Sequence, residues 1–238
     1  MNAECVSGLC SGGTCTTGPS PGPALQWRFD ENMGSTALDA SGNGHNGTYL
    51  GTAASPAVPM PGSAGNPFSR AFVRASQQAV RLPVAPSALK PANGLTLSAW
   101  YRATTVDTSG AELISAGDNY VLRLRTGQIE FAKRIASSAG TATYAICAIV
   151  VTNHLTGAWH HLAAVSSPAG MKVFLDGVER CANARGENLL YDRGPDFWVG
   201  RHGNGSTAWD FEGNIDDLRV YPRALTPAEI AVLGSSAQ

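Results

Sequence analysis

The sequence predicts an all-β protein, a sandwich or a barrel, from three observations. About a dozen short runs rich in β-branched and aromatic residues are bounded by Gly, Pro, Asn or Asp, as in LTLSAWYRA, YVLRLRTG, WHHLAAVS and NIDDLRVY. Hydrophobic residues make up 43% of the 238 residues and charged residues 15%, which suits a well-buried sheet protein. Only one segment, near the C-terminus, carries the signals of a helix.

The first 23 residues differ in composition from the rest. Cys5, Cys10 and Cys15 recur at five-residue spacing in a Gly/Ser-rich segment that has too few apolar residues to fold without cross-links. Because three cysteines cannot all pair with one another, we expect residues 1–15 to be a disulfide repeat truncated at its start. Zinc is the alternative, although a fourth ligand is not nearby. Residues 16–23 are predicted to be a Pro/Gly/Ser/Thr linker, and residues 24–238 the folded domain.

The cysteines indicate export, and the charge limits the partners. A disulfide repeat predicts a secreted or cell-surface protein, with the signal peptide upstream of this sequence and a bacterial source. The 17 basic and 18 acidic residues give a net charge of -1, which provides no bulk field for nucleic acid or an anionic membrane. No run approaches the roughly 18 apolar residues of a membrane span. We expect no nucleic-acid binding, no membrane insertion and a monomeric domain.

Turn and capping signals fix several elements. Thr126-Gly127 and Asp176-Gly177 each separate two β-rich runs and predict hairpins, because residues at such turns must tolerate positive φ. Near the end, Thr226, Pro227 and Glu229 form a capping box with proline at the first helical position. They predict a short closing helical turn.

Alternation along two strands assigns their faces. In YVLRLRTG, Leu122 and Leu124 share one face, while Arg123 and Arg125 point to the other. In LTLSAWYRA, Trp100 lies opposite the leucines. We therefore expect the leucines in the core and the two arginines and Trp100 outside it.

Four segments in order resemble the laminin-G-like members of the concanavalin A-like lectin/glucanase superfamily. They are WRFDENMGSTALDASGNGHNGTYLG, LTLSAWYRA, GAWHHLAAV with MKVFLDGVE, and FEGNIDDLRVYPRALTPAEI, and they extend over about residues 24 to 234. The resemblance implies a two-sheet antiparallel jelly-roll sandwich. Function transfers less well, because one fold carries many different sites.

The resemblance also implies a structural calcium ion. In this family the DxSGNG loop and the acidic pair of the final strand often meet at calcium, which carries over to Asp39, Asn43 and Asp216, with Asp30 as an extra ligand. Carboxylate and amide oxygens are the ligands that calcium prefers. The alternative is a plain turn in which Asp39 and Asn43 bond their own backbone.

Cys147 and Cys181 are expected to pair in an exported protein. Each lies in a β-rich run, and they are 34 positions apart. Two buried free thiols are the alternative.

Ligand-binding candidates lie on the polar face and in one loop. Arginine forks match carboxylates and sulfates, and aromatic rings stack on sugars. In the purely structural alternative, the arginine stems cover apolar surface and Trp209 anchors packing. The candidates are Trp100, Arg123, Arg125, Arg134, His202 and Trp209.

The sequence favours binding over catalysis. The superfamily includes β-glucanases with a Glu-x-Asp-x-Glu strand, which is absent here, and polysaccharide lyases with Gln-Ile-His, where this chain has Gln128-Ile129-Glu130. We expect a non-catalytic extracellular module that binds carbohydrate, acidic glycans included. The alternatives are a protein-adhesion module and, less favoured, a glycoside hydrolase or polysaccharide lyase.

Overall fold

The computed structural model describes the backbone of residues 8–11, 14–17, 19–51, 56–57, 68–92, 94–107, 109–137 and 140–235. Side chains are described in the same ranges from residue 19 onward, except at 56–57. β1 (Gly8–Ser11) and β2 (Thr14–Thr17) form a two-stranded antiparallel pair in which the backbones of Cys10 and Cys15 are opposite. Cys5 lies outside the described residues, so the N-terminal disulfide repeat and the domain boundaries remain predictions.

Two antiparallel sheets form a sandwich, which confirms the predicted fold class. Sheet I, as we call it, has the order β13-β12-β11-β10-β17-β8-β5-β4. Its strands are β4 (Thr36–Ala37), β5 (Gly47–Leu50), β8 (Ala79–Leu82), β10 (Ala111–Ala116), β11 (Tyr120–Arg125), β12 (Gln128–Ala136), β13 (Ala142–Val150) and β17 (Phe197–Val199).

Sheet II has the order β16-β15-β14-β9-β18-β7-β6, and a further strand, β3, also pairs with β18. Its strands are β3 (Leu25–Trp27), β6 (Pro56–Ala57), β7 (Ser69–Phe72), β9 (Leu95–Arg102), β14 (Trp159–Ser167), β15 (Gly170–Leu175), β16 (Val178–Asn183) and β18 (Gly213–Tyr221). Three short 3-10 turns, η1 (Arg74–Ser76), η2 (Ser87–Leu89) and η3 (Thr207–Trp209), lie in the connections.

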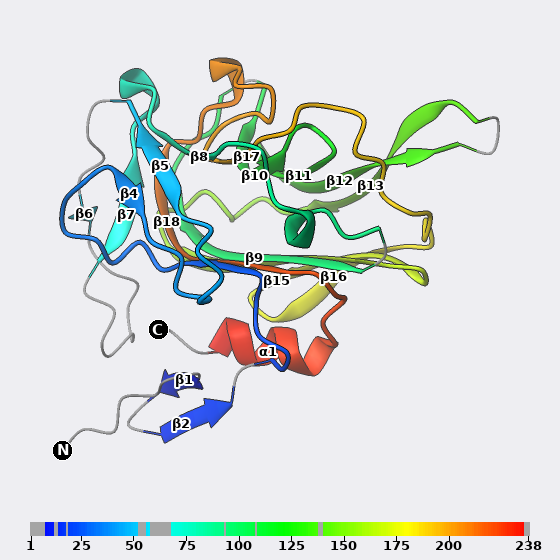
Figure 1. Cartoon of the computed structure of the whole chain (residues 1–238), viewed down its shortest axis with the longest axis horizontal. Coiled ribbons are helices and arrows are strands. Elements are labelled where there is room, and N and C mark those ends of the chain that lie inside the picture. Colours follow the sequence, from blue (N-terminus) through cyan, green and yellow to red (C-terminus); the bar gives the residue numbers. More distant parts are fainter. Residues whose placement is uncertain are drawn as a thin grey trace.

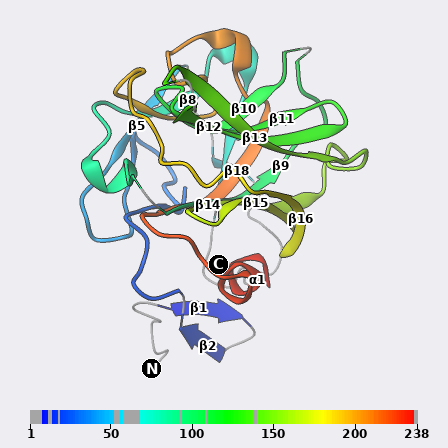
Figure 2. The same cartoon turned by 90° about the vertical axis from the view of Figure 1, so that its right-hand side faces the viewer.

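Helix α1 (Pro227–Ser235) covers part of the outer face of sheet II. Figures 1 and 2 show the helix packed below sheet II, where Ile230 and Leu233 join a small apolar cluster with Phe174 and Tyr221. The predicted capping box is present, since the amide of Glu229 donates to the Thr226 hydroxyl and the amide of Thr226 donates to the Glu229 carboxylate. Within the described residues, no helix is long and apolar enough to span a bilayer.

The core lies between the sheets and follows from the alternation of the strands. Leu122 and Leu124 of β11 and Leu97 of β9 are fully buried in it, as predicted. Trp27 is also fully buried, packs edge-on against Phe197 at 5.7 Å between ring centroids, and donates its indole N–H to the carbonyl of His45. The start of the domain is therefore anchored in both sheets.

Both predicted hairpins are present. Thr126-Gly127 connects β11 to β12 with Arg125 opposite Gln128, and Asp176-Gly177 connects β15 to β16. Asp176 and Gly177 have φ values of 52° and 76°, as a tight hairpin turn requires. The far ends of the domain also meet, because β3 pairs antiparallel with β18, Trp27 lying opposite Leu218.

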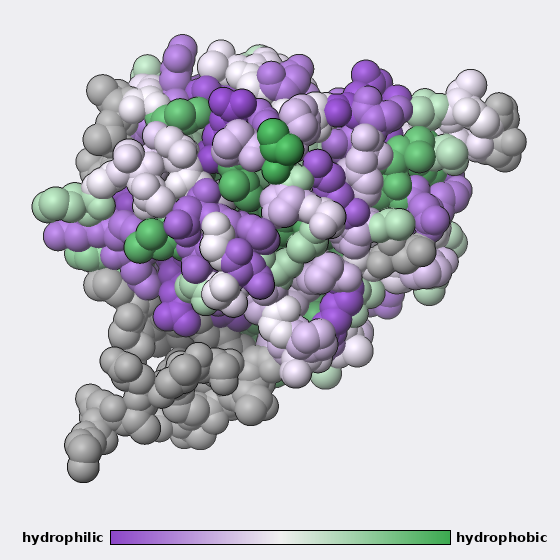
Figure 3. All heavy atoms as spheres, viewed as in Figure 1, coloured by the Kyte–Doolittle hydropathy of each residue, from purple (hydrophilic) through white to green (hydrophobic). Residues whose placement is uncertain are grey.

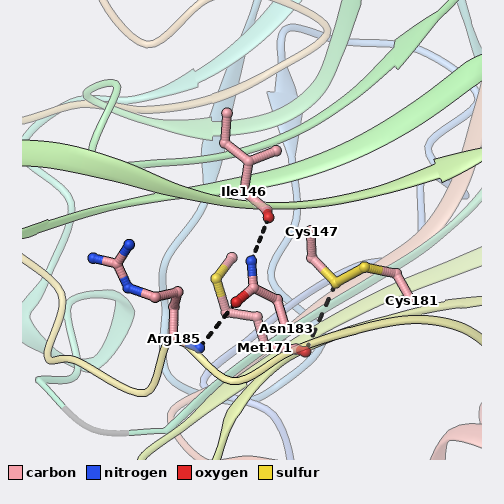
Figure 4. Close-up of a disulfide and its surroundings, with 6 residues drawn as sticks. All are labelled: Ile146, Cys147, Met171, Cys181, Asn183 and Arg185. Carbon is pink, nitrogen blue, oxygen red and sulfur yellow. Dashed lines mark hydrogen bonds between the residues drawn. A yellow bond between two sulfur atoms is a disulfide. The ribbon is translucent and has the colours of Figure 1, made fainter.

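A disulfide joins the edge strands of the two sheets. Cys147 on β13 is bonded to Cys181 on β16, as the sequence predicted (Figure 4). Beside it, Asn183 of β16 donates its side-chain amide to the carbonyl of Ile146 on β13 at 2.8 Å. Lys133 gives a second polar link, since its buried ammonium donates to the Ser166 hydroxyl of β14. This edge of the sandwich is closed by covalent and polar bonds.

Loss of the disulfide is expected to lower the free energy of unfolding by about 4 kcal/mol, because the bond closes a loop with a sequence separation of 34 in the unfolded chain. The measurement is urea denaturation of the wild type and of the double variant Cys147→Ala/Cys181→Ala. A wild-type protein reduced with dithiothreitol should match the double variant. Equal stability of the oxidised wild type and the double variant would contradict the expectation.

Candidate functional site

The outer face of sheet I carries charged residues in register. Glu112 of β10 lies opposite Arg123 of β11, and Arg123 lies opposite Glu130 of β12. Cross-strand partners share a face, so these three side chains lie in one row across the sheet. The next row on the same face is uncharged, with Val121 opposite Ala132.

Trp209 lies over Arg123 of this row and over Arg125, which is opposite Gln128 one row further along. The guanidinium carbons of Arg123 and Arg125 lie 5.2 and 5.3 Å from the Trp209 ring centroid, within the range of a cation–π interaction. Both guanidinium groups also ion-pair with the same Glu130 oxygen, and Arg125 does so at 3.2 Å. The ring of His202 packs at 6.1 Å from that of Trp209. We call Trp209, Arg123, Arg125, Glu130 and His202 the Trp209 cluster.

A buried ion pair holds the loop that carries Trp209. Arg201 donates two hydrogen bonds to the carboxylate of Asp210, at 2.8 and 2.7 Å, and Asp210 is fully buried. Phe211 is in the core, and the Ser206 hydroxyl caps the short η3 turn. Trp209 itself remains partly exposed. The loop therefore presents the indole from a fixed base.

Glu112 is the most unusual group near the cluster. It is fully buried, and no hydrogen bond with good geometry reaches either of its oxygens from the described residues, although the Ser115 hydroxyl lies nearby. Burial raises the pKa of Glu112 to about 8, against the smaller lowering effects of Ser115 and Arg123. His202 lies between two carboxylates, with Nε2 3.8 Å from Glu112 and 3.7 Å from Asp118, and burial lowers its pKa.

A second group of similar composition lies at the other end of these strands. Arg134 of β12 is opposite Tyr144 of β13, and its guanidinium carbon lies 5.4 Å from the Tyr144 ring centroid. Arg134 also donates two hydrogen bonds to the carboxylate of Asp192, whose side chain is 47% exposed. The Tyr144 hydroxyl donates to the Asp118 carboxylate at 2.7 Å. We call Arg134, Tyr144 and Asp192 the Tyr144 cluster.

Trp100 does not join the other candidates. It lies outside the core as expected, but on the outer face of sheet II, opposite His161 and Asp216 in register. Its ring packs 5.3 Å from that of His161. The structure thus brings Arg123, Arg125, His202 and Trp209 together, places Arg134 further along the same face, and sets Trp100 apart.

The residues expected to bind calcium are arranged as a hydrogen-bonded turn. The Asp39 carboxylate accepts the amide N–H groups of Gln26, Ser41 and His45 at 3.0, 2.9 and 2.9 Å. Partial burial raises the pKa of Asp39, but these bonds outweigh it and leave the pKa below its usual value. The Asn43 side-chain amide donates to the Ala24 carbonyl at 3.1 Å.

The two remaining expected ligands, Asp216 and Asp30, differ from each other. The fully buried Asp216 accepts the amide of Asp217 at 2.8 Å. Asp30 has one buried oxygen without a hydrogen-bond partner, and burial raises its pKa to about 6. Across the described part of the chain, no three His, Cys, Asp or Glu side chains group so as to hold a metal ion. Asp39 has little capacity left for a metal ion, because a carboxylate has about four acceptor positions and Asp39 already uses three.

Sequence reasoning missed the carboxylates that complete the two clusters. The two-residue Thr126-Gly127 turn fixes Arg125 opposite Gln128, and hence Arg123 opposite Glu130. The Arg123–Glu130 pair could therefore have been predicted from the sequence. Asp192 gave no such signal. It lies in the connection between β16 and β17, and it reaches Arg134 because the amide of Leu190 donates to the Arg134 carbonyl.

The chain belongs to the concanavalin A-like lectin/glucanase superfamily. Residues 74–231 match the laminin G family that carries this description, which is well over half of the chain. No curated protein matches the sequence.

Solved structures share the fold. Domain 4 of AbnA, an extracellular arabinanase from Geobacillus stearothermophilus in complex with arabinotriose, is 23% identical with a TM-score of 0.64, over 91% of this chain and 98% of that domain. The binding domain of Paraclostridial mosquitocidal protein 1 is 13% identical with a TM-score of 0.65, over 90% and 52%. The receptor-binding domain of botulinum neurotoxin C/D is 12% identical with a TM-score of 0.64, over 90% and 51%. This chain spans about half the length of the two toxin domains, and identities this low establish the fold alone.

Substitution Glu112→Gln is expected to raise the free energy of unfolding by about 4 kcal/mol at pH 8, and by about 1 kcal/mol at pH 5. A carboxyl with a pKa of 4.5 unfolded and about 8 folded makes the wild type less stable as pH rises through that window. The neutral amide has no such dependence. Urea denaturation at several pH values checks this. Glu179→Gln, in an exposed pair with Lys172, is the control, and parallel curves for wild type and Glu112→Gln would contradict the expectation.

Proposed function

We propose that this protein is a non-catalytic carbohydrate-binding module of a secreted or cell-surface protein. The observation that carries the proposal is the Trp209 cluster, in which a partly exposed indole lies beside two arginines and a carboxylate on the outer face of sheet I. An aromatic ring offers a flat surface to the C–H face of a sugar. Charged groups beside it supply both donors and acceptors for hydroxyl groups.

The surface chemistry supports a polar ligand. Figure 3 shows one side of the molecule, on which hydrophobic atoms occur in small separate clusters among hydrophilic and neutral ones. A broad apolar surface, which would indicate an obligate protein interface, is not seen on that side. Small ligands are recognised by a few well-placed polar groups around an aromatic or apolar surface.

The carboxylates of the cluster are poorly placed for glycoside hydrolysis, which requires two of them on either side of the scissile bond. Glu130 is ion-paired to two arginines. Glu112 is fully buried and cannot reach a substrate on the surface. These positions support binding without catalysis.

A protein partner is the second candidate function, and the edge strand β13 supports it. Ile146 and Val150 of this strand are 43% and 87% exposed, and Val178 at the start of β16 is 50% exposed. Because the disulfide closes this edge against β16, a partner would contact the exposed apolar side chains rather than add a strand. A protein ligand would bind there without needing Trp209.

Substitution Trp209→Ala is expected to weaken glycan binding at least tenfold, because the stacking surface is lost. A glycan array probed with the full chain identifies ligands, and calorimetry with neutral arabino-, xylo- and cello-oligosaccharides measures affinity. Arabinotriose is the first of these, since the arabinanase domain was crystallised with it.

The matched control for this prediction is Trp159→Ala. Trp159 is a partly exposed tryptophan on sheet II, and the guanidinium carbon of Arg102 lies 5.7 Å from its ring centroid, so it matches Trp209 in residue type, partial exposure and contact with arginine. It should leave glycan affinity unchanged. An equal loss of glycan affinity in both variants, or an affinity unchanged by Trp209→Ala, would contradict a binding site at Trp209. Silence on every glycan would favour the protein partner.

Calcium at Asp39, Asn43, Asp216 and Asp30 is a separate proposal. Asp39→Ala is expected to lower the free energy of unfolding by about 2 kcal/mol, because three backbone amides lose their acceptor. Urea denaturation with excess calcium and with chelator separates the two interpretations. If the loop is only a hydrogen-bonded turn, Asp39→Ala lowers the free energy of unfolding equally with calcium and with chelator. The wild-type melting temperature is then the same in both conditions. A wild-type melting temperature several degrees higher with calcium would establish the metal site.

A further inference from the structure

The outer face of sheet I carries the same combination of groups twice. In the Trp209 cluster, an aromatic ring packs on Arg123 and Arg125, which pair with Glu130. In the Tyr144 cluster, an aromatic ring packs on Arg134, which pairs with Asp192. Each cluster thus has a flat surface, guanidinium donors and a carboxylate acceptor.

The separation of the clusters is set by strand β12. Glu130 and Arg134 are both on this strand and on the same face, four residues apart, which is about 13 Å at the usual rise per residue. This distance exceeds the length of one sugar unit. The row between them is uncharged: Val121 and Ala132 are buried, at 2% and 4% exposure, and Ile146 is 43% exposed.

Both clusters are held to the same framework. Asp118 accepts from the Tyr144 hydroxyl at 2.7 Å and lies 3.7 Å from Nε2 of His202, whose ring packs against Trp209. Buried anchors fix the two flanking connections, Arg201 with Asp210 for one and the Leu190 amide on the Arg134 carbonyl for the other. The spacing of the clusters is therefore constant.

The charges of the two clusters are largely compensated. Glu130 ion-pairs with both arginines of the first cluster and offsets one of their two charges, and Asp192 pairs with Arg134 through two parallel hydrogen bonds. An anionic sugar would have to displace these carboxylates from their guanidinium partners. A neutral sugar would use the paired groups as they stand, its hydroxyls donating to the carboxylate and accepting from the guanidinium.

We infer that the ligand is a neutral oligosaccharide of at least three sugar units, which lies along the β11–β13 surface of sheet I and contacts the Trp209 cluster with one end and the Tyr144 cluster with the other. The inference rests on the proposed function. It replaces the acidic glycan expected from the arginines alone, and it makes Tyr144 and Asp192 ligand-binding residues.

The test is calorimetry of the full chain with neutral arabino-, xylo- and cello-oligosaccharide series from one to six units. Wild-type affinity for the series that binds should rise about tenfold or more between two units and five, and then level off. Trp209→Ala should weaken binding of all lengths. Tyr144→Ala should leave the disaccharide within about twofold and remove the gain with length.

Further variants and ligands keep the outcomes distinct. Tyr144→Phe retains the ring and should keep the gain with length, while Asp192→Ala should reduce it without affecting Tyr144 stacking. Thermal melting verifies that each variant folds. Three results would overturn the inference and leave the carbohydrate-binding function standing. They are an affinity that does not change with ligand length, equal effects of Tyr144→Ala on short and long ligands, and tighter binding of a uronic-acid hexamer. If no neutral series binds, the inference fails, and the carbohydrate-binding function fails with it only when the glycan array also shows no binding.

Discussion

The apolar layer between the two sheets is the constraint on which the rest of the structure depends. Because side chains alternate along a strand, every residue committed to that layer commits its neighbours to an outer face. Leu122 and Leu124 are fully buried between the sheets, and this places Arg123 and Arg125 outside. The positions of the charged residues on sheet I are thus a consequence of packing. The disulfide between Cys147 and Cys181 then holds the free edges of the two sheets together.

The two outer faces differ because only one is covered by a helix. On sheet II, α1 packs over Phe174 and Tyr221. Polar residues of this sheet bond to one another, since the Gln26 side-chain amide and the Arg219 guanidinium both donate to the carboxylate of Asp217. On sheet I, the covering element is the loop with η3, which lies over Arg123 and Arg125 of β11. Residues 129–135 of β12 are buried, and the outer face of β13 is the more exposed part of the sheet. A face that is only partly covered combines fixed side chains with access for a ligand, which neither a bare sheet nor a fully covered one provides.

The sequence predicted the fold well because local signals agreed with one another. Alternation in β11, the Asp176-Gly177 turn and the Thr226–Glu229 capping box each depend on residues close in the chain, and each is present. The long strand near the end was also recognised, in the run NIDDLRVY. Helix α1 is nine residues long, more than the short turn expected.

The candidate site was predicted less completely, and the reason is physical. Single arginines were identified from their face, but which carboxylate neutralises each one depends on strand order and on connections between distant elements. Arg134 pairs with Asp192, which is 58 positions away in the sequence. Trp209 reaches Arg123 from the connection between β17 and β18. An arginine considered alone indicates an anionic ligand; the same arginine beside a carboxylate and an aromatic ring indicates a polar, uncharged one. The Arg123–Glu130 pair follows from a local hairpin, but Asp192 and Trp209 reach their arginines through long-range contacts, which local sequence patterns do not encode.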